Sequence, residues 1–170
     1  MKLKKMFLPV LLSFVITGCA GCPYSFTGAS LPADMKSIAI PIFEDLSGFG
    51  EAGLREKITD ELRRKFTDDN TLKISDRKIS DTILEGAILS VRDEPSVITG
   101  TERVSTRRIT LSVKAIFTDM RSRKTIWEKN FSQWGDYDAT GGGIASRQTG
   151  FQTAIEKLTE DILIATVSDW

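Results

Sequence analysis

The sequence predicts an α+β fold, with a small, mostly antiparallel sheet of four to five strands and two amphipathic helices packed on one face. Residues 108–117 alternate between apolar and polar side chains, which is typical of a strand with one buried and one solvated face. Two other segments repeat apolar residues with the period of a helix. The predicted order of elements is β-α-β-β-β-β-α.

The first half of the predicted domain holds one helix and three strands. Residues 36–43, KSIAIPIF, form a β-rich apolar run and predict a strand, which Pro41 places at a sheet edge or near its own end. A short strand at 72–75 and a longer one at 82–91 are expected further along the chain. Between the first two strands, an amphipathic helix over 54–66 is expected from apolar residues four apart, which are Leu54, Ile58, Leu62 and Phe66.

The second half joins a hairpin to a second helix. The alternating strand 108–117 leads through a turn at 119–124 into a partner strand at 125–134. Residues 135–148, GDYDATGGGIASRQ, are polar and glycine-rich, and we expect a mobile loop there. The last helix carries its apolar stripe at Phe151, Ile155, Leu158, Ile162 and Ala165.

The N-terminal residues have the layout of a secretory signal peptide. Lysines 2, 4 and 5 precede an uncharged apolar run at 6–16, which is shorter than the roughly 20 residues needed to span a bilayer. The exit, Ile16-Thr17-Gly18-Cys19, resembles the lipobox of bacterial lipoproteins, in which the cysteine takes a diacylglycerol and the signal is cut just before it. We therefore predict a lipoprotein signal at 1–18, a tether at 19–35 and a single domain at 36–170.

Cys19 and Cys22 are the two cysteines of the chain, and other uses compete with lipidation. A redox CxxC pair should lie where a strand meets a helix, and a zinc site needs about four ligands in a chain that has no histidine. A disulfide between them would close a tiny loop and constrain little. The lipobox favours Cys19 as the acylated residue, with Cys22 as the alternative. Because aspartate after the cysteine is typical of inner-membrane retention, Ala20 favours the outer membrane, facing the periplasm.

The charge balance argues against a nucleic-acid partner. The chain has 23 basic and 23 acidic residues, and without the three lysines of the signal the remainder carries a net charge of −3. One segment departs from this balance, because residues 103–129 hold eight basic residues against two acidic ones.

No pattern in the sequence indicates an enzyme, a cofactor or a metal site. The chain has no histidine, which is the commonest general base. The glycine-rich stretches GFGEAG and TGGGIAS match neither the P-loop nor the dinucleotide-binding spacing. We therefore expect no catalytic residues and no metal ligands.

The basic hairpin is the best candidate for an interaction surface. Arg108 and Lys114 should share the solvated face of one strand, while Arg121, Arg123 and Lys124 crowd the turn. One interpretation is an exposed hairpin whose cations protect a sheet edge. The other is a partner that carries phosphate, because arginine suits phosphate through paired N–H donors.

Several stretches resemble the LptE family of lipopolysaccharide-assembly lipoproteins. They are CPYSFTGASLPADMKSIAIPIFED, LREKITDELRRKF, LKISDRKISDTILEGAILSV and RITLSVKAIFTDMRSRKTIWEKNFSQWGDY, which cover nearly the whole chain after the signal. The family begins with a lipidated cysteine followed by GY-F and a Leu-Pro pair, which Cys22-Pro23-Tyr24-Ser25-Phe26 and Leu31-Pro32 match with proline in place of glycine. Leu84-Glu85-Gly86 and Trp127-Glu128 also fit. This alignment favours Cys22 over Cys19, so the lipidated cysteine stays open.

The resemblance implies a small sheet with two packed helices and a non-catalytic role. It also implies that the protein partners and plugs the outer-membrane β-barrel LptD and that it binds lipopolysaccharide. Because lipid A carries phosphates, the five hairpin cations would then contribute to lipopolysaccharide binding. A rival resemblance, carried by IAIPIFED, the first helix and the LEG strand, is to the TolB N-terminal, CsgG and LpoB group of periplasmic modules, which act in polymer secretion or envelope-enzyme regulation.

Overall fold

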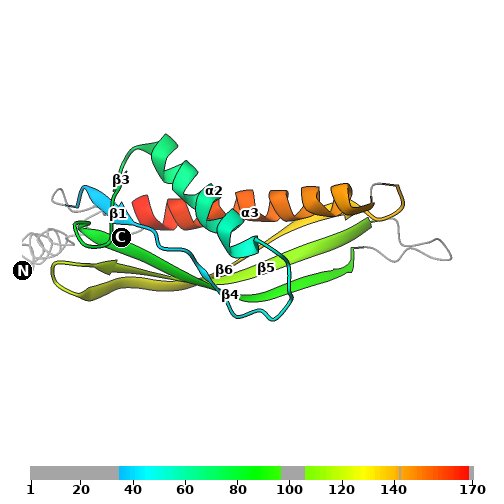
Figure 1. Ribbon diagram of the computed structural model, residues 1–170, viewed down its shortest axis with the longest axis horizontal. Coiled ribbons are helices and arrows are strands. Elements are labelled where there is room, and N and C mark those ends of the chain that lie inside the picture. Colours follow the sequence, from blue (N-terminus) through cyan, green and yellow to red (C-terminus); the bar gives the residue numbers. More distant parts are fainter. Residues whose placement is uncertain (1–34, 97–105, 142, 169–170) are drawn as a thin grey trace, which may run out of the picture.

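The computed structural model describes residues 35–96, 106–141 and 143–168. Two helices and one mixed sheet make up this part of the chain (Figure 1). The predicted signal, Cys19, Cys22 and all of the predicted tether except Met35 lie outside the described residues.

Three long antiparallel strands form the body of the sheet. They are β4 (Thr82–Pro95), β5 (Thr106–Asp119) and β6 (Lys124–Asp138), and β5 pairs with its two neighbours along its length. Two short strands, β1 (Ser37–Ala39) and β2 (Glu44–Asp45), pair in parallel with β4, and a third, β3 (Lys73–Ile74), pairs in parallel with β1. The sheet order is β3-β1-β4-β5-β6, and β2 pairs with β4 further along.

The α+β prediction is confirmed, and the six strands of the described sheet exceed the four to five expected. The predicted strand 36–43 is shortened to β1, and the extra strand is β2, which lies just beyond residue 43. Pro41 lies between β1 and β2, and a proline has no N–H to donate to a strand ladder.

The prediction of a mobile loop at 135–148 is wrong. Strand β6 continues to Asp138, and α3 (Gly143–Val167) begins five residues later. Tyr137 is buried, and Arg147 on the first turns of α3 donates to Glu51 (2.8 Å). Residues 139–141 after β6 form a turn, in which the Asp138 carboxylate accepts hydrogen bonds from the N–H and hydroxyl of Thr140 (2.7 and 2.6 Å).

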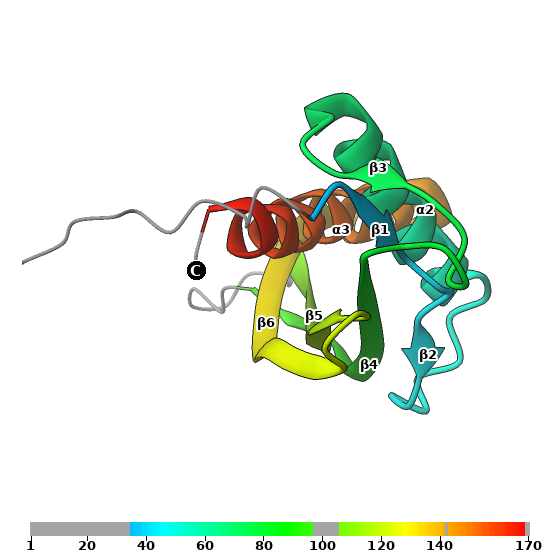
Figure 2. The same ribbon diagram turned by 90° about the vertical axis from the view of Figure 1, so that its left-hand side faces the viewer.

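Both helices lie on the same side of the long sheet (Figure 2). Helix α3 lies along β5 and β6, and α2 (Leu54–Asp69) lies beside α3 on the β1–β3 side. Asn70 ends α2 in the left-handed conformation (φ 57°), and its N–H donates to the Phe66 carbonyl (3.1 Å). Neither described helix combines the length and the apolar character that crossing a bilayer requires.

The predicted apolar stripes meet in one core between the sheet and the helices. The alternating residues of β5 are fully buried and belong to the same core cluster as the stripes of both helices. Among the described residues, the core and the apolar side chains packed against it run from Ile38 to Val167, so a chain that starts after Cys22 keeps all of them. The buried positions of β5 are Ile109, Leu111, Val113, Ala115 and Phe117.

Candidate functional site

The face of the long sheet that points away from the helices is polar. On β5 it carries Arg108, Thr110, Ser112 and Lys114, which alternate with the buried positions. The register places Ser112 opposite Ser132 of β6, and their hydroxyls are 3.1 Å apart. This open face is the surface on which the sequence placed the first two candidate cations.

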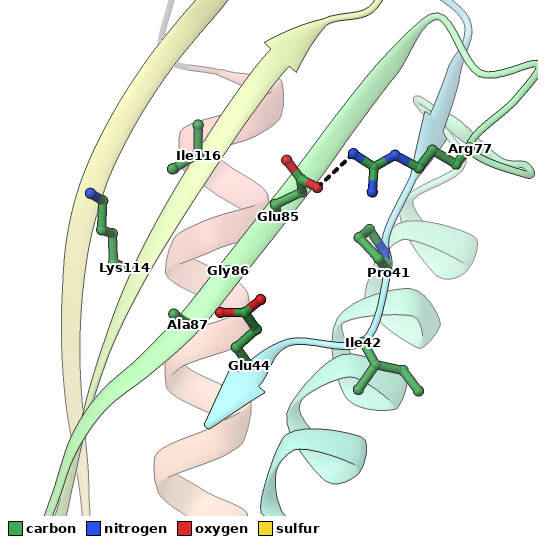
Figure 3. Close-up of a pocket in the computed structure, with 9 residues that line it drawn as sticks. All are labelled: Pro41, Ile42, Glu44, Arg77, Glu85, Gly86, Ala87, Lys114 and Ile116. Carbon is green, nitrogen blue, oxygen red and sulfur yellow. Dashed lines mark ion pairs between the residues drawn. The ribbon is translucent and has the colours of Figure 1, made fainter. Parts of the chain in front are cut away.

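Lys114 lies in the middle of the open face and is paired. Its Nζ is 2.6 Å from Oε1 of Glu128 on β6. Next to it, a shallow hollow of about 380 Å³ lies between the β1–β2 segment and strands β4 and β5 (Figure 3). The hollow is lined by Pro41, Ile42, Glu44, Arg77, Glu85, Gly86, Ala87, Lys114 and Ile116.

The charges around this hollow cancel. Arg77 pairs with Glu85 (3.1 Å), as the dashed line in Figure 3 shows. Glu44 adds a second carboxylate, and Lys114 is already engaged with Glu128. A strongly anionic ligand therefore gains little from the hollow.

Arg108 is held by neighbours on β6. Its Nε and a terminal nitrogen donate to the two carboxylate oxygens of Asp136 (2.7 and 2.9 Å). Its guanidinium also lies 3.6 Å from the centre of the Trp134 ring. The hydrogen bonds from Arg108 lower the pKa of Asp136 below its usual value. Arg108 therefore has a structural role on the open face.

The remaining three candidates lie at the β5–β6 turn. Asp119 shapes this turn by accepting hydrogen bonds from the N–H of Arg121 (2.8 Å) and the hydroxyl of Ser122 (2.7 Å). Arg121 donates to the carboxylate of Asp81, while Arg123 (φ 56°) and Lys124 are exposed. A left-handed arginine costs about 1–2 kcal/mol, which the turn tolerates.

The structure does not bring the five cations together. Thirteen residues separate Arg108 from Arg121, which at about 3.4 Å per strand residue is roughly 40 Å, with Lys114 between them. Arg121, Arg123 and Lys124 form a group, which we term the basic turn. The basic turn is the part of the predicted site that presents exposed cations to a ligand.

The sequence analysis missed a network of charged residues at the other end of the sheet. Asp93 of β4 accepts hydrogen bonds from Arg107 Nε (2.8 Å), the Tyr137 hydroxyl (2.9 Å) and Arg147 Nε (3.3 Å). Burial raises the pKa of Asp93, but the hydrogen bonds from Arg107, Tyr137 and Arg147 outweigh it, and the net pKa lies below the usual value. Arg147 also donates to Glu51, so the network ties the segment before α2 to α3 and the sheet.

No short motif in the sequence marks this network. Arg147 falls in the predicted loop, and Asp93 falls just beyond the predicted end of its strand. The alternation of strand β6 is the one sequence pattern that could have indicated part of the network, because it places Tyr137 on the same side of the strand as Gly135. Among the described residues, no group of three or more His, Cys, Asp or Glu side chains gathers in a way that could hold a metal ion.

Comparison with protein families gives one match over most of the chain. The model of the family described as "LptE: Lipopolysaccharide-assembly" matches residues 35–166. No curated protein matches the chain.

Several solved structures share the fold at low sequence identity. A protein from Xanthomonas campestris has a TM-score of 0.58 at 12% identity, over 82% of this chain and 90% of that one. Lipoprotein B from Nitrosomonas europaea has a TM-score of 0.52 at 14% identity, over 86% and 90%. The PelC dodecamer from Paraburkholderia phytofirmans also has a TM-score of 0.52 at 14% identity, over 81% and 92%. At these identities the likeness extends to the fold alone.

Proposed function

The chain belongs to the LptE family of lipopolysaccharide assembly, and from this premise we propose that it is a lipid-anchored outer-membrane protein that partners an LptD-like β-barrel and binds lipopolysaccharide. The family match over residues 35–166 carries the proposal. The role is a binding and plugging role in the barrel and involves no catalysis.

The fold suits a protein that fits inside or against a barrel. The long strands and α3 form an elongated body around one core (Figure 1). Most charges on the open face are paired across neighbouring strands, as in Arg108 with Asp136 and Lys114 with Glu128. A rigid, polar surface of this kind can face a hydrated barrel interior without burying unpaired charge.

The basic turn supplies the proposed contact with lipopolysaccharide. Lipid A carries phosphates, and the exposed side chains of Arg123 and Lys124 offer cationic donors. Arg121 adds a third cation beside them, already oriented by Asp81. Arg108 and Lys114 are engaged by carboxylates, so their contribution to phosphate binding is the smaller one.

The proposed membrane anchor is an acylated cysteine, either Cys19 or Cys22. Several acyl chains on one residue hold a protein on a bilayer nearly permanently, because each buried CH2 contributes about 0.8 kcal/mol. The anchor would hold the domain on the periplasmic side of the outer membrane.

The proposal is tested by isolating the full-length, lipidated protein from its own membranes in mild detergent and identifying the co-purifying chains by mass. A large β-barrel protein in near one-to-one ratio is the expected result. Binding of fluorescent lipopolysaccharide to the purified protein gives a second test. Undiminished binding after Arg108, Lys114, Arg121, Arg123 and Lys124 are all changed to Gln would remove the proposed contact.

A second candidate function is a ring-forming periplasmic module of the TolB N-terminal, CsgG and LpoB type. The observation in its favour is the fold shared with PelC, which forms a dodecamer. Native mass spectrometry of the detergent-extracted protein separates the two candidates. A ladder of self-oligomers without a barrel partner supports the ring-forming module, and a heterodimer supports the barrel partner.

A further inference from the structure

One end of the molecule gathers three segments that are far apart in the sequence. They are the start of β1, the connection at 76–80 between β3 and β4, and the β5–β6 turn (Figure 1). Asp81 joins them, because its carboxylate accepts hydrogen bonds from the backbone N–H groups of Lys36 (3.0 Å) and Ser37 (3.1 Å) and from Arg121. We term this region the β1 end.

The β1 end carries many exposed cations. Lys36 lies directly beside Lys73 of β3, whose N–H donates to the Lys36 carbonyl (2.9 Å). Lys78 lies in the 76–80 connection, and Arg123 and Lys124 lie at the neighbouring turn. All five of these residues are exposed.

Most carboxylates of the β1 end are engaged within the molecule. Asp81 and Asp119 accept the hydrogen bonds already described, and Glu85 pairs with Arg77. Asp76 is an exposed carboxylate in the same connection, so it reduces the surplus without removing it. The surface that this end offers to a partner is therefore positively charged.

Ile79 adds an apolar group among these cations. It is 75% exposed and follows Lys78 in a tight connection, in which the N–H groups of Ile79 and Ser80 both donate to the Asp76 carbonyl (3.0 Å each). A single exposed isoleucine is ordinary on a protein surface. Beside a cluster of cations it forms the combination that binds an anionic bilayer, where apolar groups enter the interface and cations stay at the phosphates.

The chain also reaches the β1 end from the direction of the proposed anchor, and this step rests on the proposed function. Met35 lies two residues before the start of β1, and Cys22 lies 13 residues before Met35. Thirteen residues reach at most about 45 Å when extended and average about 20 Å as a flexible chain. A lipid on Cys22 or Cys19 would therefore keep the β1 end close to the bilayer.

We propose that the β1 end docks on the anionic headgroups of a phospholipid bilayer. Ile79 enters the interface, and Lys36, Lys73, Lys78, Arg123 and Lys124 contact lipid phosphates. The turn between β6 and α3 lies at the opposite end of the elongated body (Figure 1).

The first test measures co-sedimentation of residues 23–170, which contain the whole core and no cysteine, with phospholipid vesicles. Binding is expected to vesicles with about one third phosphatidylglycerol and not to pure phosphatidylcholine. Changing Lys78, Arg123 and Lys124 to Gln should weaken binding at least tenfold, since each cation near the surface contributes substantially. A matched control changes Arg55, Arg64 and Arg92 to Gln, which removes the same charge elsewhere and should change binding less than twofold.

The second test locates the contact. A cysteine introduced as Ile79→Cys or as Ile144→Cys carries an environment-sensitive fluorophore; Ile144 is 81% exposed on the first turn of α3 and serves as the matched position. The label at 79 should shift to the blue and be quenched by spin-labelled lipid, and the label at 144 should not. Equal responses at the two positions would overturn the proposal, as would equal loss of binding in the two charge variants.

Lipopolysaccharide separates this inference from the proposed function. Binding to lipopolysaccharide micelles without binding to phosphatidylglycerol vesicles would overturn the docking proposal and leave the proposed function standing. Vesicle binding through the β1 end in a protein that binds neither lipopolysaccharide nor a barrel would support the docking proposal and overturn the proposed function.

Discussion

Gly135 of β6 and Gly150 of α3 bring the two backbones into direct contact. A Cβ placed on Gly135 would lie 2.1 Å from the Gly150 carbonyl oxygen, and one placed on Gly150 would lie 3.1 Å from Cδ1 of Tyr137. This contact sets how closely α3 approaches the sheet, where the helix covers β5 and β6.

Gly135→Ala should lower the free energy of unfolding by about 2–3 kcal/mol, because the added methyl group meets rigid backbone on a packed helix. Urea denaturation followed by circular dichroism measures the change. Gly141→Ala is the control, since its nearest atom would be Asp138 Oδ2 at 3.9 Å, and it should change stability by less than about 0.5 kcal/mol. Equal stability of the Gly135 variant and the natural protein would show that α3 can shift away from β6.

The same contact explains how far the sequence predicts the fold. Periodicity in a sequence reports burial within one element, so the strand at 108–117 and both helical stripes are confirmed. It does not report contacts between elements, and a glycine needed for close packing has the same local signature as a loop glycine. The glycine-rich composition of residues 135–148 therefore predicts a loop, although Gly135 and Tyr137 belong to β6 and α3 begins at Gly143.

The candidate site was predictable in composition and not in geometry. The local excess of basic residues predicts an interaction surface on the β5–β6 hairpin, and this stays a prediction. The carboxylates that engage Arg108 and Arg121 are Asp136 and Asp81, which lie 28 and 40 residues away in the sequence. Counting charges along the chain cannot reveal such pairs, because strand register brings them together.

Asp93→Asn should destabilise the protein by about 2–4 kcal/mol. Asp93 is mostly buried, and removing its charge leaves Arg107 and Arg147 without the carboxylate that both contact. The measurement is the free energy of unfolding in urea at pH 7. Asp60→Asn on the surface of α2 is the matched control, because the Asp60 side chain is 73% exposed, and it should cost less than about 0.5 kcal/mol. Similar losses in the two variants would mean that the network contributes nothing of its own.

Asp81 should make folding stability depend on acid pH. The backbone N–H of Lys36 and the Arg121 and Ser37 side chains outweigh burial and lower the pKa of Asp81 from 3.8 to about 2. A lowered pKa gives stability that is complete above about pH 4 and is lost as the pH falls through about 2. At neutral pH this amounts to roughly 2 kcal/mol.

Asp81→Asn tests this dependence through unfolding free energies measured at pH 7, 4, 3 and 2. The variant should be less stable than the natural protein at pH 7, and the difference should shrink between pH 4 and pH 2. Asp68→Asn, on the exposed surface of α2, is the matched control and should change stability at pH 7 by less than about 0.5 kcal/mol. A difference for Asp81→Asn that stays constant across the range would contradict the assignment.

Arg108 and the basic turn should separate stability from ligand binding. Arg108→Gln loses the paired hydrogen bonds to Asp136 and the contact with Trp134, which should cost about 1 kcal/mol because the side chains are about one third exposed. Its binding of fluorescent lipopolysaccharide should change less than twofold. The double variant Arg123→Gln, Lys124→Gln should show the opposite pattern, with stability unchanged within about 0.5 kcal/mol and binding weakened about tenfold.

Salt gives this comparison an independent check. Contacts between exposed cations and phosphate are screened at high ionic strength, so 0.5 M NaCl should weaken binding by the natural protein more than by the double variant. If Arg108→Gln reduced binding more than the double variant did, the phosphate contact would belong to the open face of the sheet and not to the basic turn.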